Sequence, residues 1–400
     1  MNFYNEIHHP SFTDFLLLRP SAVNHLPHSV ECGSRWRTYG SSSGWSSDIT
    51  DSAIGEHFER KHFYLDIPVH DTCRLGDGLT TEECQAFTKA FSQTLISSEK
   101  SSLQSHCFDR TSVYRVTDFT SCKVPTACLS ISECKNSTDN GFYPIRDTCG
   151  CSAHITINNA VLGAIRENLE RQFLLRFWLT KTCTAEIEFD DACLTLTASA
   201  SLALFQELKK SGELCILNLT DQRFPGSCIL LCYGSQDINA KIKYCAGMAY
   251  AATSRIALEK SIVELWQTLR FMQSVDSEHE LKNPLQDPYL KHFLSCNSYD
   301  TFKEMSSEVK FTQHNHELTL SKKLTIQNLL KTLRALQLNG YLYLSSTPYK
   351  QSNLYLCKYF SPNLFLHMNN ARHFNLENTY SAPFYNEIIS NQNSKMVPFP

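Results

Sequence analysis

Two short acidic motifs in the sequence combine residue types and a spacing that could carry chemistry. Residues 56–60 read Glu-His-Phe-Glu-Arg, and residues 167–171 read Glu-Asn-Leu-Glu-Arg. Residues three apart in a helix lie on one face, so each motif would bring two carboxylates side by side. Their repulsion is relieved partly by the arginine that follows, and a divalent cation would relieve it further. Two such helix faces across a cleft therefore predict a site for a hard cation.

Magnesium is the cation that suits this donor set, because it takes one or two carboxylates and completes its shell with phosphate oxygens and water. Arg60 or Arg171 could then stabilise charge on a phosphoryl group. A third helix would add Glu264 and Gln267, again three residues apart. The predicted metal ligands are the four motif glutamates and one residue of that third helix: Glu56, Glu59, Glu167, Glu170 and Glu264.

A plainer explanation stays open for each motif taken alone. Acidic residues followed by arginine on a helix are commonly a solvated face with an internal ion pair of little energetic value. The second motif argues against that explanation, because apolar residues surround its acids instead of lying on the opposite face. These apolar residues are Leu162, Ile165, Leu169 and Phe173.

Helical spacing of apolar residues predicts the elements that would position these motifs. We expect helices over residues 52–63, 158–179, 254–272 and 322–338. Strands are expected over 215–219, 228–233 and 341–345, the first two flanking a turn with Pro225-Gly226. Long helices between short strands predict an α+β domain of mixed sheet and helix, with a carboxylate-lined cleft for ATP and magnesium.

Three segments are expected along the chain. Residues 1–45 are predicted to be irregular, and the Ser/Gly-rich stretch 41–47 is predicted to be a loop. Residues 46–390 would form the ATP-binding domain, with a polar surface excursion near 276–301. Residues 391–400 would form a proline-containing tail.

Composition excludes several other classes of protein. Lysine and arginine number 37 against 40 acidic residues, so the basic footprint of a nucleic-acid binder is missing. No apolar run is long enough to span a membrane and no secretory signal is recognisable, so a cytoplasmic location is expected. The 17 cysteines contain no C-x-x-C pair, which argues against zinc. No P-loop or Gly-x-Gly-x-x-Gly turn occurs, so ATP would be bound through carboxylates and magnesium.

The sequence resembles the YcaO family at three places in the family's order. Residues 52–60 match a Ser-x3-Glu-x2-Glu-Arg helix, and residues 150–171 match a Gly-Cys loop that leads into an Ala-x2-Glu-x2-Glu-Arg helix. Residues 257–267 match an alanine-containing helix with Glu-x2-Gln. Further stretches, 55–63, 146–152, 365–370 and 394–400, are similar to the cyclodehydratase subunits of microcin-type synthetases, which make oxazole- and thiazole-bearing peptide antibiotics.

The resemblance implies roles for individual residues. The motif glutamates would hold magnesium, Glu170 and Arg171 would be catalytic, and Glu264 with Gln267 would complete the nucleotide site. Other predicted cofactor-binding residues are Ser52, Arg60, Ser152 and His154. The chain departs from many relatives at Gln172, where they have aspartate, and it lacks the fused partner domain that some relatives carry.

The tail ends in Pro398-Phe399-Pro400, which cannot enter a helix or a central strand. A frayed end is the ordinary expectation for such a tail. Azoline-forming relatives end in proline-rich tails that reach the active site, so the resemblance implies a catalytic role for Pro400.

The resemblance implies an ATP-dependent cyclodehydratase that converts Cys, Ser or Thr of a precursor peptide to thiazoline or oxazoline by phosphorylating a backbone amide oxygen. Its implied partners are an E1-like subunit that binds the leader peptide and a flavin-dependent dehydrogenase, which would hold FMN. Two alternatives stay open: another YcaO reaction, such as thioamide or amidine formation, and a non-catalytic ATP-binding scaffold subunit.

Overall fold

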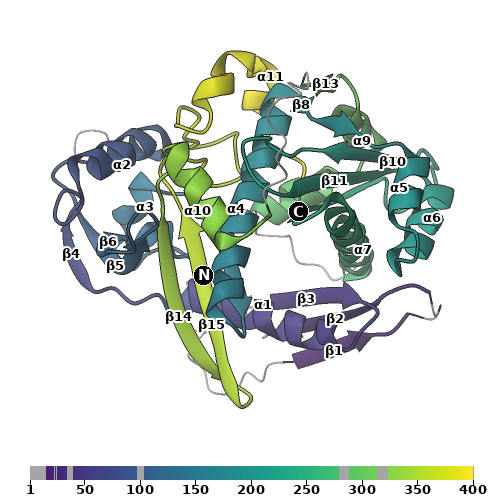
Figure 1. Cartoon of the computed structure of the whole chain (residues 1–400), viewed down its shortest axis with the longest axis horizontal. Coiled ribbons are helices and arrows are strands. Elements are labelled where there is room, and N and C mark those ends of the chain that lie inside the picture. The colour runs from purple at the N-terminus through teal and green to yellow at the C-terminus, as the bar shows by residue number, and fades with distance from the viewer. Residues whose placement is uncertain are drawn as a thin grey trace.

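Helix α4 (Ile157–Thr180) lies between two antiparallel sheets at the centre of the computed structural model (Figure 1). Its first turn is capped by Thr156, whose hydroxyl accepts the backbone N–H of Asn159, and it ends at Lys181 in the left-handed conformation. Most of its residues are buried, because the helix is packed on several sides. The structure describes residues 15–21, 23, 25–33, 39–96, 103–278, 288–312 and 323–399.

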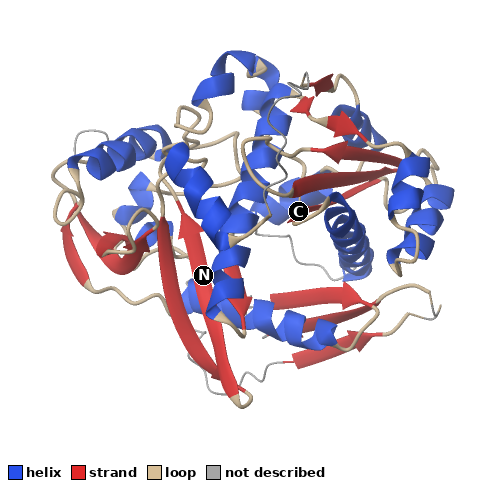
Figure 2. Ribbon diagram, viewed as in Figure 1, coloured by secondary structure: helices blue, strands red, loops and turns tan. Residues whose placement is uncertain are grey.

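The first sheet has six strands and lies on one side of α4 (Figure 2). Its path runs β4–β5–β14–β15–β7, and β6 also pairs with β5. A separate core of aromatic residues lies beneath it, including Phe87, Phe91 and Phe108. The elements of this part are β4 (Asp71–Arg74), α2 (Thr81–Thr94), β5 (Cys107–Arg115), β6 (Ser121–Pro125), η3 (Thr126–Cys128), α3 (Asp139–Phe142), β7 (Cys151–His154), β14 (Tyr341–Tyr349) and β15 (Ser352–Phe360).

The second sheet has four strands in the order β12–β11–β10–β9. Every residue of β11 and β12 is buried, because helix α7 (Ser254–Glu278) packs against both strands and α4 packs against β12. Gly247 allows the close approach of α7, since a Cβ there would lie 2.2 Å from the backbone nitrogen of Leu265. The elements of this part are β9 (Ala185–Glu186), α5 (Phe189–Thr195), α6 (Ser201–Ser211), β10 (Glu213–Asn218), β11 (Ser227–Gly234) and β12 (Tyr244–Ala251).

A third sheet, of strands β1 (Phe15–Arg19), β2 (His28–Gly33) and β3 (Tyr39–Gly44), packs on helix α1 (Asp48–Leu65). The prediction of an irregular segment over residues 1–45 is therefore wrong for these strands, and the predicted 41–47 loop is wrong over 41–44. After Tyr39, β3 contains only glycine and serine, which do not favour strands, so the strand depends on pairing with β2 and on packing against α1.

The last part of the chain returns across α4 and towards the first sheet. The predicted surface excursion over 276–301 is wrong where α8 and α9 lie, because Phe293 and Cys296 are buried in the core. The elements here are β8 (Thr182–Cys183), α8 (Pro288–Ser295), α9 (Tyr299–Ser306), β13 (Lys310–Phe311), α10 (Ile326–Ala335), η4 (Ala382–Glu387) and α11 (Ser390–Asn393).

The predicted positions of the main elements are confirmed. The helices expected over 52–63, 158–179, 254–272 and 322–338 correspond to α1, α4, α7 and α10, and the expected strands correspond to β10, β11 and β14. Strands β10 and β11 pair antiparallel, as the turn between them predicted. The α+β class is confirmed as well. In the part of the chain that the structure describes, every helix is too short or too polar to cross a bilayer.

Candidate functional site

Helices α1, α4 and α7 bring the predicted acidic residues together, and Ser41 of β3 joins two of these helices. The backbone N–H of Ser41 donates to Oε2 of Glu56 on α1 (2.9 Å). The side-chain amide of Gln267 on α7 donates to Oγ of Ser41 (2.5 Å) and to its carbonyl oxygen (3.3 Å). Gly40 permits this contact, since a Cβ there would lie 2.1 Å from the carbonyl oxygen of Ala53 on α1.

The first motif forms a compact charged group on α1. Arg60 pairs with Glu56 (3.2 Å) and with Glu59 (3.8 Å). Glu59 is buried and accepts the backbone N–H of Ala153, so strand β7 lies directly against the motif. The guanidinium of Arg60 also lies within electrostatic range of Glu167 on α4, which links the two motifs.

The second motif lies against β12 and α7. Glu170 accepts the backbone N–H of Tyr250 (2.7 Å), and Glu264 accepts that of Met248 (3.2 Å), so two backbone N–H groups of the edge strand β12 hold both carboxylates. Arg171 pairs with Glu170 (3.8 Å) and lies within electrostatic range of Glu264. The structure therefore brings all five predicted metal-binding glutamates into one cluster.

Burial dominates the electrostatics of this cluster. It raises the pKa of Glu59 to about 7 and the pKa of Glu167 to about 8, in each case against the opposing charge of a neighbouring arginine. The pKa of Glu264 rises to about 8 through burial and the nearby charge of Glu170, and burial also raises the pKa of Glu170. Buried carboxylates close to one another hold protons unless a cation offsets their charge.

The chemistry of the donor set fits magnesium. Five carboxylates face two guanidiniums, so the cluster carries an excess of negative charge when it is fully ionised. Oε2 of Glu167 is buried without a hydrogen-bond partner, which leaves a hard oxygen donor unused. As the side chains stand, no three acidic, histidine or cysteine groups among the described residues converge tightly enough to hold a metal. Loading magnesium would therefore exchange carboxylate–arginine contacts for carboxylate–metal bonds.

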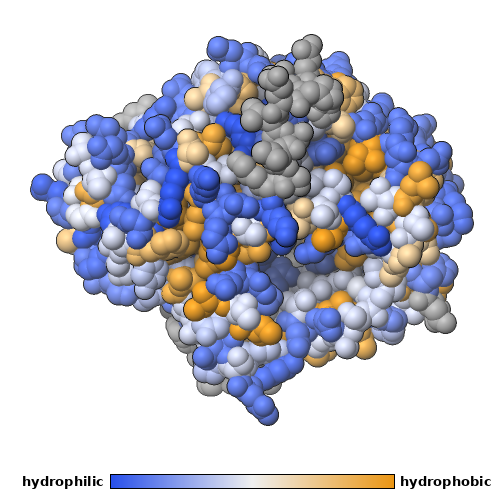
Figure 3. Space-filling model, viewed as in Figure 1, coloured by the Kyte–Doolittle hydropathy of each residue, from blue (hydrophilic) through white to orange (hydrophobic). Residues whose placement is uncertain are grey.

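A cleft of about 750 Å³ opens beside the cluster, between β3, α1 and α7. The space-filling view shows this face of the molecule hollowed between the small sheet and the rest of the chain (Figure 3). Sequence reasoning missed three polar residues that line the cleft: Ser41, Arg255 and Lys260. Ser41 lies in the Ser/Gly-rich stretch that the sequence predicts to be a loop. Arg255 lies just before the Ala257–Gln267 stretch of α7 and Lys260 lies within it, so this stretch is the signal that could have found them, although neither belongs to its Glu-x2-Gln motif.

Three predicted site residues lie at the margin of the cluster. The Ser52 hydroxyl is exposed one turn before Glu56 and donates to the carbonyl oxygen of Asp48. Ser152 packs against Gly163 on α4, where a Cβ would lie 2.2 Å from the serine oxygen. The His154 ring contacts residues of the α4 N-terminus, Thr156 and Asn159, and no contact joins it to the glutamates.

The departure at Gln172 has a structural explanation. Its amide donates to the carbonyl oxygen of Phe365 (3.1 Å) and accepts that residue's backbone N–H (2.9 Å). An aspartate is one methylene shorter and cannot donate, so glutamine suits this reciprocal pair. The position lies on α4 next to Arg171 but contributes to packing of the chain that follows β15.

Residues 396–399 of the tail are buried, so the frayed alternative is wrong for them. Two hydrogen bonds hold the tail. The Tyr244 hydroxyl donates to the carbonyl oxygen of Pro398 (2.8 Å), and the backbone N–H of Val397 donates to the side-chain oxygen of Asn370 (3.0 Å). The ring of Phe399 lies 4.9 Å from the guanidinium carbon of Arg171, a cation–π contact. The tail therefore reaches the second motif, whereas Pro400 lies outside the described residues.

Residues 51–365 of this chain, which form the helices around the cleft, match a family model described as YcaO cyclodehydratase, ATP- and Mg²⁺-binding. The chain belongs to this family, and it is an ATP-dependent cyclodehydratase of the YcaO type. It is 30% identical to the microcin B17-processing protein McbD of Escherichia coli over 364 residues, which cover 91% of this chain and 90% of McbD.

Two solved structures agree with that similarity. A chain of the E. coli microcin synthetase McbBCD complex superposes with a TM-score of 0.86 at 29% identity, covering 96% of each chain. A chain of the same complex with pro-MccB17 bound superposes with a TM-score of 0.85 at 30% identity, again over 96% of each chain. The resemblance inferred from the sequence motifs is confirmed, both for the family and for the microcin-type subunit.

Proposed function

We propose that this chain closes azoline rings in a ribosomally made precursor peptide by phosphorylating backbone amide oxygens. A Cys, Ser or Thr side chain of the peptide attacks the preceding carbonyl carbon and loses its proton. The resulting oxyanion attacks the γ-phosphate of ATP, which releases ADP. Cleavage of the bond between the carbon and the phosphorylated oxygen then releases inorganic phosphate, and the former amide nitrogen loses its proton, which leaves a C=N bond in a thiazoline or oxazoline ring. The buried cluster of five glutamates beside the 750 Å³ cleft is the observation that carries this proposal.

The residues of the cluster divide the work between holding ATP and stabilising charge. Glu56, Glu59, Glu167, Glu170 and Glu264 would hold magnesium, which supplies charge neutralisation for the phosphates. Arg171 would stabilise the charge of the phosphoryl group in transfer, with Arg60 in the equivalent place on α1. Ser41 and Gln267 would fix the wall of the cleft where β3 meets α7.

Ser52, Ser152 and His154 would line the approach to the nucleotide, as expected of the family's motifs. Lys260 and Arg255 add positive charge on the cleft side of α7, which suits a triphosphate. A catalytic role for Pro400 belongs to this proposal, because Phe399, the residue before it, contacts the guanidinium of Arg171.

We further propose that the chain works with two kinds of partner in the cytoplasm. An E1-like subunit would hold the leader peptide, and a flavin-dependent dehydrogenase carrying FMN would oxidise azolines to azoles. The relative McbD is part of a complex with other subunits, and one structure of that complex has pro-MccB17 bound, which supports a partnered enzyme. Seventeen free cysteines suit a reducing compartment.

The test is the intact mass of a Gly/Ser/Cys-rich precursor peptide co-expressed with this chain and its partner subunits. We expect the loss of one water mass for each ring, with a further loss of two hydrogens where the dehydrogenase acts. The loss should disappear when this chain is omitted or carries Glu170→Gln. As a matched control, Glu207→Gln changes an exposed glutamate on α6 and should leave the masses unaltered.

An unmodified peptide in the presence of soluble partners and bound ATP would point to the scaffold alternative. A mass gain that corresponds to the replacement of oxygen by sulfur would point to thioamide formation instead. Full modification by the Glu170→Gln variant would contradict the assignment of the site.

A further inference from the structure

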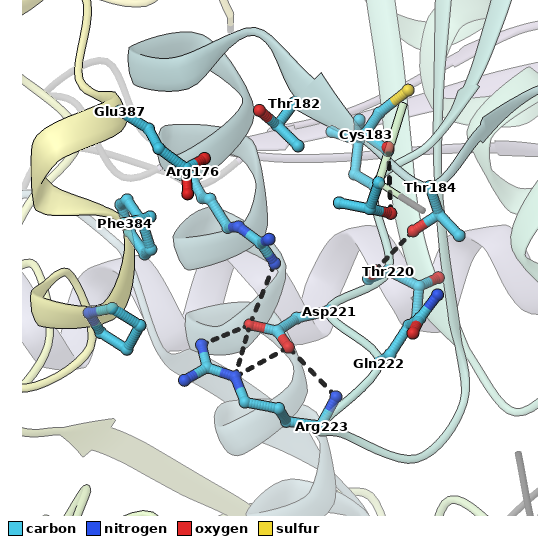
Figure 4. A pocket seen from close by; sticks show the side chains of 13 residues that line it. Arg176, Thr182, Cys183, Thr184, Thr220, Asp221, Gln222, Arg223, Phe384 and Glu387 are labelled. Atoms are coloured by element: carbon cyan, nitrogen blue, oxygen red, sulfur yellow. Dashed lines mark hydrogen bonds and ion pairs between the residues drawn. The ribbon is translucent and has the colours of Figure 1, made fainter. Parts of the chain in front are cut away.

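A second polar cavity of about 260 Å³ lies near the C-terminal end of α4, away from the nucleotide cleft (Figure 4). Its wall is formed by Arg176 of α4, by the turn between β10 and β11, and by Phe384 of η4. Strand β8 and the residue after β13 add threonine side chains. The cavity shares no lining residue with the cleft beside the glutamates.

Asp221 is the fixed point of this cavity. It exposes only 2% of its surface, and both its oxygens accept hydrogen bonds from Arg223, whose Nε and Nη2 lie 2.9 and 2.6 Å away. Nη1 of Arg176 lies 3.3 Å from Oδ2 of the same carboxylate. Burial alone would raise the pKa of Asp221, but the bonds and charge of the two arginines outweigh burial and lower the pKa. Asp221 is therefore an ionised, fully used acceptor.

Two guanidiniums share this single buried carboxylate, so one positive charge is left over in the cavity. Nε of Arg176 is buried and has no hydrogen-bond partner, although an unpaired buried donor costs free energy. Glu387, the other acidic lining residue, is exposed at the rim, where water screens its charge. The interior therefore presents an excess cation and an unused donor, which together suit an anionic acceptor.

The hydroxyl groups of the wall narrow the class of anion. Thr182, Thr184 and Thr312 donate their hydroxyl hydrogens to backbone carbonyl oxygens, so they present lone pairs to the cavity. A ligand that has both acceptor oxygens and an O–H donor can satisfy the arginine and the threonines together. Hydrogen phosphate has both, whereas a carboxylate or sulfate has acceptors alone. The volume is below the roughly 300–1,000 Å³ of sites for drug-sized ligands, which favours a small ion.

We propose that the Arg176–Asp221–Arg223 cavity is a binding site for a small hydroxylated oxyanion of the phosphate class, separate from the nucleotide site. Asp221 holds both arginines in position, Arg176 provides the open Nε donor, and the threonines accept from the P–OH group. The site neither requires nor supplies a residue of the glutamate cluster.

The test is calorimetric titration of the full-length chain with inorganic phosphate near neutral pH in magnesium-free buffer. Magnesium is left out so that no metal holds phosphate at the glutamate cluster, and the Arg176 variants assign the binding event to the second cavity. We expect one saturable binding event that Arg176→Gln weakens by about tenfold or more, as loss of a charge-assisted hydrogen bond implies. Arg74→Gln removes an exposed arginine on β4 and should leave the affinity unchanged.

Arg176→Lys is a second variant that keeps the charge while removing Nε, so it remains informative if Arg176→Gln misfolds. It too should weaken phosphate binding. Parallel titrations with sulfate and acetate should give weaker binding than phosphate. Equal affinity for acetate would assign the cavity to carboxylates and overturn the proposal, as would phosphate affinity that is unchanged in both Arg176 variants.

Discussion

The two polar sites along α4 use the same residue types in opposite proportions. Around Glu170 and Arg171, five carboxylates face two guanidiniums, whereas around Arg176 two guanidiniums face the one carboxylate of Asp221. Both sites are largely buried, so neither excess charge is solvated as it would be at the surface. The ratio of acids to arginines therefore sets the sign of the excess charge, which suits cations with their phosphates at the first site and the proposed small anion at the second.

The two sites are also joined by a short chain of contacts. The turn that holds Asp221 continues to Phe224, whose ring packs 5.5 Å from that of Phe173 on α4. The hydroxyl of Tyr250 donates to the carbonyl oxygen of Pro225, and its backbone N–H holds Glu170. These contacts join the turn that carries Asp221 to the strand that holds Glu170.

The largest effect expected is on turnover. Glu167→Gln removes the carboxylate with the unused oxygen and should lower magnesium-dependent ATP consumption by about 10³-fold, the order seen when a charged catalytic group is lost. Arg176→Gln on the same helix should leave ATP consumption within about twofold, since a group outside the reacting atoms makes no transition-state contact. Phosphate release in the assembled synthetase measures both. Equal losses of ATP consumption in the two variants would contradict the functional separation of the two sites.

A second prediction concerns the wall of the first site. Gly40→Ala places a Cβ 2.1 Å from the carbonyl oxygen of Ala53, so it should lower the free energy of unfolding by about 2 kcal/mol and weaken ATP binding. Gly55→Ala on α1 meets nothing within 4 Å and should stabilise the helix by about 0.5–1 kcal/mol. Chemical denaturation and nucleotide titration of both variants check this pair. Equal stability and equal nucleotide affinity of the two variants would mean that β3 does not approach α1 so closely.

A third prediction sharpens the role of the tail at the first site. Phe399→Leu keeps an apolar side chain but removes the ring beneath Arg171, and should lower kcat by about tenfold while changing the KM for ATP less. Met396→Leu in the same buried tail is the control for altered packing and should have little effect. Steady-state kinetics at saturating precursor distinguish the two. A fall in stability without a fall in kcat would assign Phe399 to packing alone.

The smallest expected effect is a pH dependence of stability in the metal-free protein. The pKa values of Glu59 and Glu167, about 7 and 8, lie above the ordinary carboxyl value, so between pH 5 and 8 the folded state binds more protons than the unfolded state. Stability should therefore fall as pH rises through this window, by about 2 °C or more in the melting midpoint. Magnesium with ATP should restore it at pH 8. A melting midpoint that rises with pH would contradict the raised pKa values.

The sequence predicted that the glutamates of three helices come together, and it gave no sign of the Arg176–Asp221–Arg223 group, for physical reasons. Glu-x2-Glu on an apolar-patterned helix specifies which carboxylates share a face, and the family's order of motifs supplies the partners of that face. Arg176, Asp221 and Arg223 come together only through the return of the β10–β11 turn onto α4. No local spacing encodes that contact, since it depends on tertiary packing.

The same limit explains the errors in the fold. Strand β3 consists of glycine and serine after Tyr39, and its hydrogen bonds to β2 and its packing on α1 decide its conformation. Ser41 was therefore read as a loop residue, although it links Glu56 to Gln267. Helix α8 follows a polar stretch and buries Phe293, which a short amphipathic pattern does not distinguish from a surface loop.

The small N-terminal sheet should open more readily than the rest of the fold, which bears on access to the cleft. Among the described residues, its own core holds four buried hydrophobic residues, Val30, Cys32, Ile49 and Ala53, against several dozen in the core around α4. A unit with so few buried contacts detaches at a lower free energy than that of global unfolding. Backbone amides of β2 and β3 should thus exchange with deuterium ahead of those of β11 and β12. Local opening of the strand that carries Ser41 would then give nucleotide a route into and out of the cleft.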